Sequence, residues 1–138
     1  MTRIYLVRHA QAEGNLYRRA HGSYDSLVTP LGYAQIEALK RRFAEIPVDV
    51  VYSSPRYRAR TTAAAIYVPK QIPMYVLDDL HEVNCGPWED RTWGEIRYTD
   101  PEQLDNFNYH IERWHVPGTE TPEQIRDRML GVLDTIVR

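Results

Sequence analysis

The chain has 138 residues, 43% of them hydrophobic, and this length and composition suit one globular domain, 1–138, with a core of its own. Its formal net charge of −2 excludes a whole-chain electrostatic attraction to nucleic acid or to an acidic membrane surface, so we expect neither as a partner. The single cysteine, Cys85, excludes an internal disulfide framework, and the lack of any signal-like or membrane-spanning apolar run favours a cytoplasmic protein.

The first predicted element is a buried strand over residues 3–8, which contains the apolar run 4–7. Four apolar residues without alternation are typical of a strand that is covered on both faces. The run ends in Arg8 and His9 and is followed by small residues. A cation and an imidazole are therefore expected at the carboxyl edge of the sheet, where open α/β sheets bind their ligands.

Four helices are expected to begin with one device, a polar N-cap residue followed by proline at the first helical position. The four capping residues are Thr29, Ser54, Asp100 and Thr121. At the last helix, Gln124 is placed to complete a capping box. Apolar runs at 48–52 and 74–77 predict two further strands between helices. We therefore predict an α/β fold, a three-layer sandwich whose mainly parallel sheet has helices on both faces.

The helix after the second strand carries three arginines near its start, Arg56, Arg58 and Arg60. Cations at a helix N-terminus oppose the helix dipole, and a bound anion would remove this conflict. Arginine forks also favour phosphate. Three arginines in five residues can equally serve solubility, so both interpretations of the cluster stay open.

Residues from three strand ends are expected to converge, namely Arg8 and His9, Arg58, and Glu82 from an acidic loop. Such a set suits phosphoryl transfer, because two arginines can bind the equatorial oxygens of a phosphoryl group. A neutral His9 would attack phosphorus and become a phosphohistidine, and nearby guanidinium groups would keep it neutral by lowering its pKa. Glu82 would then protonate the leaving alkoxide.

Four stretches of the chain resemble, in order, motifs of the histidine phosphatase superfamily, which has the phosphoglycerate mutase-like fold. The stretches are LVRHAQAEGN at 6–15, TPLGYAQ at 29–35, YSSPRYRARTTA at 52–63 and LHEVNCGPWE at 80–89. A fifth, PGTET at 117–121, resembles the segment that opens the family's late helix. The resemblance implies a phosphomonoester hydrolase that acts on a small phosphorylated metabolite, with no cofactor.

The resemblance also implies a role for individual residues. His9 is expected to be the phosphorylated nucleophile, and Glu82 the proton donor. The residues expected to bind the phosphoryl group are Arg8, Asn15 and Arg58. Weaker contacts with the substrate are expected from Gln11 and Gly22. No metal ligand is implied, and the five histidines show no metal-ligand spacing.

Three departures from the family pattern bear on these roles. Ala10 stands where the family usually has glycine, and Ala12 stands where many members have serine or threonine. The family pattern also continues past the late helix into a strand that ends in a second histidine, and no histidine follows that helix here. We therefore interpret 1–138 as a domain that is incomplete at its C-terminus, and we expect an open sheet edge that could pair in a homodimer.

Two alternatives to a phosphatase remain. One is a cofactor-dependent phosphoglycerate mutase, although the stretch 80–89 resembles small broad-specificity phosphatases more. The other, from a different class, is a non-catalytic module that binds a phosphorylated ligand. Cys85 and Arg91 also have the spacing of cysteine-based phosphatases, but Pro87 lacks the amide that such a loop needs, and Glu89 would oppose the anion.

Overall fold

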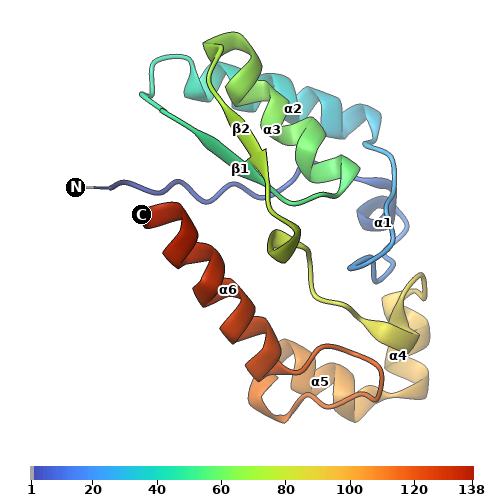
Figure 1. The fold of residues 1–138 in the computed structure, drawn as a ribbon. Coiled ribbons are helices and arrows are strands. Elements are labelled where there is room, and N and C mark those ends of the chain that lie inside the picture. The colour runs from blue at the N-terminus through green and yellow to red at the C-terminus, as the bar shows by residue number, and fades with distance from the viewer. Residues whose placement is uncertain (1) are drawn as a thin grey trace.

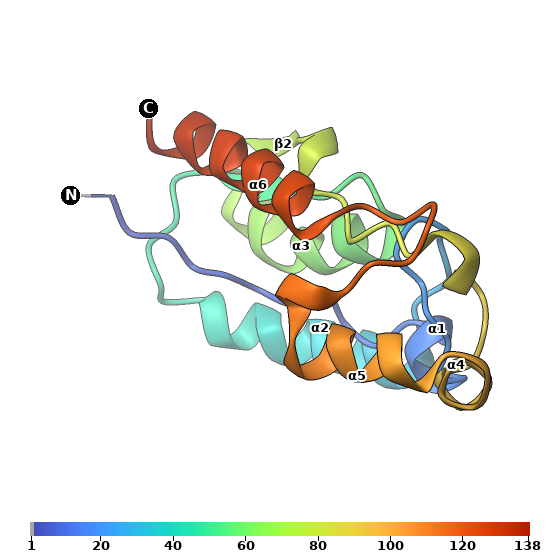
Figure 2. The same ribbon diagram turned by 90° about the horizontal axis from the view of Figure 1, so that it is seen from below.

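The sheet of the computed structural model, which describes residues 2–138, has two parallel strands, β1 (Val51–Ser53) and β2 (Met74–Val76). Helix α3 (Tyr57–Lys70) connects them, so the three elements form a βαβ unit. Helix α2 (Pro30–Phe43) packs beside α3. Figures 1 and 2 together place α2 and α3 on one side of the sheet and α6 (Pro122–Val137) on the other. The predicted α/β layering, with helices on both faces of a parallel sheet, is confirmed.

The predicted strand over residues 3–8 is wrong, because this segment is extended chain without a strand partner. A strand needs a neighbour that completes its backbone hydrogen bonds, and none of the described residues pairs with this segment in a ladder. The expected burial on both faces is also wrong, since Leu6 is 91% exposed and Ile4 is exposed as well. The ring of Tyr5 makes one edge contact, with Phe43 at 5.6 Å.

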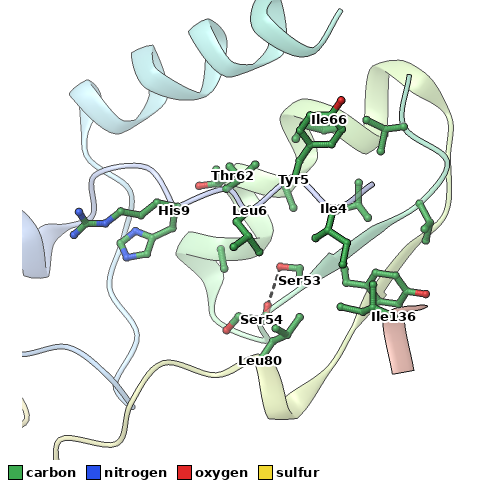
Figure 3. Close-up of a pocket in the computed structure, with 18 of the residues that line it drawn as sticks. Ile4, Tyr5, Leu6, His9, Ser53, Ser54, Thr62, Ile66, Leu80 and Ile136 are labelled. Atoms are coloured by element: carbon green, nitrogen blue, oxygen red, sulfur yellow. Dashed lines mark hydrogen bonds between the residues drawn. The ribbon is translucent and has the colours of Figure 1, made fainter. Parts of the chain in front are cut away.

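This N-terminal segment borders an open cavity of about 1200 Å³, whose other walls come mainly from α3, β1 with the residues before it, the loop 80–83 and α6. Figure 3 shows Ile4, Tyr5 and Leu6 along one wall of the cavity, and His9 at the end away from Ile136. The apolar residues that were expected inside a sheet therefore line a hollow instead.

Three of the four predicted helix starts are confirmed: α2, α5 (Pro101–Tyr109) and α6 begin at the expected prolines. The predicted capping role of Asp100 is wrong, because its side chain makes no hydrogen bond with the start of α5. Thr29 Oγ1 accepts a hydrogen bond from Gly32 N at 3.1 Å, which is the expected cap. The capping box at α6 is also present, because Thr121 Oγ1 accepts from Gln124 N while the Gln124 side chain accepts from Thr121 N.

Ser54 is not the cap of its helix. Helix α3 begins at Tyr57, because Arg56 keeps an extended backbone. The amide of Tyr57 donates instead to Asp25 Oδ2 at 2.6 Å, so a carboxylate from a distant loop takes the place of a local cap. The second strand is likewise shifted, since the predicted 48–52 is observed at Val51–Ser53.

The remaining elements are short. They are α1 (Glu13–Leu16), α4 (Trp93–Thr99) and three 3-10 turns, Asp78–Leu80, Gly86–Trp88 and Ile111–Arg113. Helices α4 and α5 and the turn Gly86–Trp88 contribute to a second hydrophobic core. Trp88 and Trp114 are buried in this core, and the ring of Phe107 lies 5.0 Å from that of Trp114. Trp88 is therefore a packing residue. In the part of the chain described here, no helix is long and apolar enough to cross a membrane.

Candidate active site

His9 lies at the end of the N-terminal segment, in a turn that α3 holds in place. The amide of Ala10 donates to Thr62 Oγ1 at 2.9 Å, and Thr62 Oγ1 donates to Arg58 O at 2.7 Å. Nδ1 of His9 lies 2.7 Å from the carbonyl oxygen of Ala10. Because a carbonyl only accepts, Nδ1 carries the proton of the neutral ring, and Nε2 keeps its lone pair.

The surroundings of His9 favour its neutral form. Burial lowers the pKa of His9 below its ordinary value, and the positive charges of Arg58 and Arg8 lower it further. The Ala10 carbonyl and the Glu82 carboxylate act in the opposite direction without reversing the shift. The expected guanidinium effect is present, but burial is the larger cause.

Arg58 is the most deeply buried charged side chain of the described residues, with 1% of its surface exposed. Its Nη2 donates to His21 O at 2.7 Å and Gly22 O at 3.2 Å, and its Nη1 donates to Tyr24 O at 3.0 Å. The carboxylate of Asp25 is 3.6 Å from Nη1. Arg58 therefore fastens the loop 21–25 to α3, and its role as a phosphate ligand stays a prediction.

The two other arginines near the start of α3 differ from Arg58. Arg56 lines the large cavity together with His9, and its buried Nε has no hydrogen-bond partner. Arg60 is exposed. Within this cluster, Arg56 and Arg58 thus line the large cavity, and Arg60 fits the solubility interpretation.

Asn15 is oriented by two contacts. Its Oδ1 accepts from Ala12 N at 2.9 Å, which leaves Nδ2 facing His21 Nε2 at 3.2 Å. Since Nδ2 can only donate, His21 Nε2 accepts and the proton of this second imidazole sits on Nδ1, which is buried without a partner. One N–H of Asn15 remains free for a ligand.

His21 is the residue that the sequence did not single out. Its ring lies 5.7 Å from the ring of His9, and the two rings meet edge to face. Burial, with the positive charge of Arg58 as the next cause, lowers the pKa of His21 to about 4. His21 is therefore a second neutral imidazole in the site, and only the folding of the loop 21–25 brings it there.

Glu82 comes from the loop after β2 and reaches the same place. A pocket of about 340 Å³ is lined by the predicted site residues Arg8, His9, Asn15, Gly22 and Glu82, together with His21. Val83 N donates to Glu82 Oε1 at 2.9 Å. Residues that are far apart in the sequence thus share one pocket, with two imidazoles and a carboxyl group on its walls.

Gln11 and Gly22 have structural contacts of their own. Gln11 lines neither cavity, and its Oε1 accepts from Thr29 Oγ1 at 2.6 Å. A Cβ atom on Gly22 would lie 1.7 Å from Val83 O, so only glycine fits there. Glu89 accepts from Ser23 N at 2.9 Å and Cys85 N at 3.0 Å, so its carboxylate holds two loops together.

Cys85 is poorly suited to nucleophilic attack. It is buried, and burial together with the negative charges of Glu89, Glu82 and Glu120 raises its pKa to about 12. A thiolate is the reactive form of cysteine, so this environment disfavours a cysteine-based mechanism. Among residues 2–138, no group of three or more His, Cys, Asp or Glu side chains is placed to hold a metal ion.

Comparisons with known proteins show related phosphatases and a similar solved structure. The chain is 31% identical over 142 residues to the metal-independent phosphoserine phosphatase of Arabidopsis thaliana, covering 100% of this chain and 59% of that protein. It is 31% identical over 100 residues to the adenosylcobalamin/alpha-ribazole phosphatase of Salmonella typhimurium, covering 72% of this chain and 50% of the other. Bacillus stearothermophilus YhfR has a similar structure, with a TM-score of 0.88 and 30% identity over 94% of this chain and 64% of that one.

The chain therefore spans about half to two thirds of the length of these proteins. The model of the histidine phosphatase superfamily (branch 1) matches residues 4–138, which is nearly the whole chain. The match includes every residue that was expected to take part in the chemistry. The protein belongs to the histidine phosphatase superfamily, branch 1.

Proposed function

We propose that the protein hydrolyses a small phosphomonoester through a phosphohistidine on His9. The observation that carries the proposal is the tautomer of His9, whose Nδ1 donates to Ala10 O and leaves the Nε2 lone pair free. A neutral imidazole with a free lone pair is a nucleophile for phosphorus. The pocket around it contains cations for the phosphoryl oxygens and one carboxyl group for the leaving oxygen.

In the first step, Nε2 of His9 attacks phosphorus, a P–N bond forms and the P–O bond to the leaving group breaks. Glu82 gives its proton to the departing alkoxide, so the alcohol leaves neutral. In the second step, the Glu82 carboxylate takes a proton from water, which attacks phosphorus, breaks the P–N bond and releases phosphate. Histidine and glutamic acid are then back in their starting forms.

Binding of the phosphoryl group falls to Arg8 and to the free N–H of Asn15. The positive charge of Arg58, which lies behind the loop 21–25, adds to the attraction for the phosphoryl group. It is close enough to lower the pKa of His9. Charge stabilisation of this kind is the main contribution a protein makes to phosphoryl transfer. The substrate is proposed to be a small phosphorylated metabolite, as the names of the two related phosphatases suggest. The homodimer, the cytoplasmic location and the incomplete single domain stay predictions.

A labelling experiment tests the proposal. Brief incubation with a 32P-labelled phosphomonoester should leave an acid-labile phosphoryl group on the wild-type protein and on Cys85→Ser. His9→Ala should not be labelled, because its side chain has no ring nitrogen. Label that survives in His9→Ala and disappears in Cys85→Ser would contradict the proposal.

The same experiment separates the two alternatives. A mutase would pass the label from His9 to a second hydroxyl of the substrate, so labelled organic phosphate would accumulate instead of inorganic phosphate. A non-catalytic module would bind inorganic phosphate, measured by calorimetry, without ever becoming labelled. Each result identifies one alternative and excludes hydrolysis by this route.

A further inference from the structure

Arg128, on α6, lies outside the set of residues that react, yet it contacts the backbone just before Glu82. Its Nη1 donates to Asp79 O at 2.6 Å and to His81 O at 3.0 Å. Its Nε and Nη2 donate to the two carboxylate oxygens of Glu120 at 2.8 and 2.9 Å. Only 10% of the Arg128 side chain and 16% of the Glu120 side chain are exposed.

Glu120 extends the contact to the other side of Glu82. Its Oε2 accepts from Asn84 N at 3.0 Å, and its own amide donates to Asn84 O at 3.1 Å. Nε2 of His81 lies 3.9 Å from Glu120 Oε1. The backbone is therefore fastened at residues 79 and 81 before Glu82 and at residue 84 after it.

The surroundings of Glu120 favour its ionised form, so it stays paired with the Arg128 cation. Burial acts to raise the pKa of Glu120, but the hydrogen bonds from Arg128 and from the Asn84 amide outweigh it, and the pKa is lowered. A bidentate arginine–carboxylate pair is planar and directional, so it fixes geometry as well as charge. Residues 82–84 have no helical or strand hydrogen bonds that could hold them otherwise, and the last such bond before them joins His81 N to Asp78 O.

We propose that Arg128, held by Glu120, is a positioning residue that fixes the backbone on both sides of Glu82 and so keeps its carboxyl group in the pocket of His9. The inference rests on the proposed function, in which Glu82 protonates the leaving oxygen. A misplaced proton donor slows only those reactions whose leaving group needs the proton. An effect that depends on the leaving group therefore separates this role from general support of the fold.

The test compares two substrates in the wild-type protein, in Arg128→Gln and in Arg128→Lys. With O-phosphoserine, whose leaving alkoxide needs a proton, kcat/KM of Arg128→Gln should fall roughly 10- to 100-fold, mostly in kcat. With p-nitrophenyl phosphate the loss should stay below about threefold. Lysine keeps the charge but lacks the planar fork, so Arg128→Lys should recover only part of the loss.

Arg126→Gln is the matched control, because Arg126 lies on the same helix and its ion pair with Asp127 is exposed. This variant should leave both substrates and the melting temperature unchanged. Equal losses on both substrates in Arg128→Gln would overturn the proposal. If Arg128→Gln fails to fold, Glu120→Gln takes its place in the same comparison, since it removes the charge of the pair but keeps the shape.

Amide hydrogen exchange gives a readout that needs no activity. The amide of Asn84 should exchange at least about tenfold faster in Arg128→Gln than in the wild type, while amides of α2 should not change. Unchanged exchange at Asn84 would overturn the proposal. A wild-type protein that hydrolyses neither substrate would refute the proposed function alone, and the exchange rates would then decide the question of Arg128.

Discussion

Two arginines hold two different parts of the candidate site: Arg58 holds the loop 21–25 beside His9, and Arg128 holds the backbone around Glu82. Arg58 of α3 donates to three carbonyls of the loop 21–25, beside His9, whereas Arg128 of α6 donates to two carbonyls in the segment 79–81, just before Glu82. The two helices lie on opposite sides of the sheet (Figure 1). Arg58 thus links α3 to the loop beside His9, and Arg128 links α6 to the segment that carries Glu82.

The difference is in their counter-charges. Arg128 forms a bidentate pair with Glu120 at 2.8 and 2.9 Å, whereas the nearest carboxylate to Arg58 is that of Asp25 at 3.6 Å. The charge of Arg58 is therefore less neutralised, and it contributes to the lowered pKa of His9. We infer that Arg58 acts on the reaction through its charge and its contacts, and that Arg128 acts through its contacts alone.

The largest expected effect comes from Arg58→Met. It leaves three carbonyls without their donor and should lower the free energy of unfolding by about 4 kcal/mol, measured by urea titration. Activity should fall by at least about 1000-fold on both alkyl and aryl substrates, because charge stabilisation serves every leaving group. A loss confined to alkyl substrates would remove the distinction between the two arginines.

How well the sequence predicted these parts depends on how local their causes are. Thr29 and Thr121 were predicted as caps because a threonine side chain bonds an amide three residues on, within the same stretch of sequence. Ser54 failed because the acceptor for the start of α3 is Asp25, which only the folded loop brings there. The strand over 3–8 failed because a strand is defined by its partner, and a pattern of apolar residues does not contain one.

The site shows the same division. Arg8, His9 and Glu82 were predicted because residues that follow strands gather at one edge of a sheet, and the turn after an extended segment keeps that placement even without a ladder. His21 and Arg128 could not be predicted in this way. One sits in a polar loop and the other on an amphipathic helix, and their roles come from contacts with residues more than ten positions away.

A smaller effect is expected from pH, through His21. Its pKa in the folded chain, about 4, is below the ordinary value of 6.5. Between these pH values the unfolded chain binds a proton at His21 and the folded chain does not. This contribution to the free energy of unfolding is complete above pH 6.5 and is lost as the pH falls toward 4, by about 1–2 kcal/mol because solvent screens the half-buried ring. Urea titrations at pH 7.5 and 4.5 measure the change.

His21→Gln should remove most of this pH dependence, while the exposed His115→Gln should keep it. Arg58 donates to the carbonyl of His21, and its charge contributes to the lowered pKa of the His21 ring. The measurement therefore also tests the part of the comparison that concerns Arg58. If the free energy of unfolding of His21→Gln depends on pH as steeply as that of the wild type, another group with a lowered pKa causes the dependence.

The smallest effect is expected from Gln11→Ala, which decides whether Gln11 touches the substrate or supports the start of α2. Gln11 Oε1 accepts from Thr29 Oγ1 at 2.6 Å, and the residue lines neither cavity. Removing this acceptor should cost about 1 kcal/mol of the free energy of unfolding and leave KM unchanged. A several-fold rise in KM with unchanged stability would instead restore the expectation of a substrate contact. The part of the site around His9 would then include Gln11 as a substrate ligand, in addition to the residues of the loop 21–25 that Arg58 holds in place.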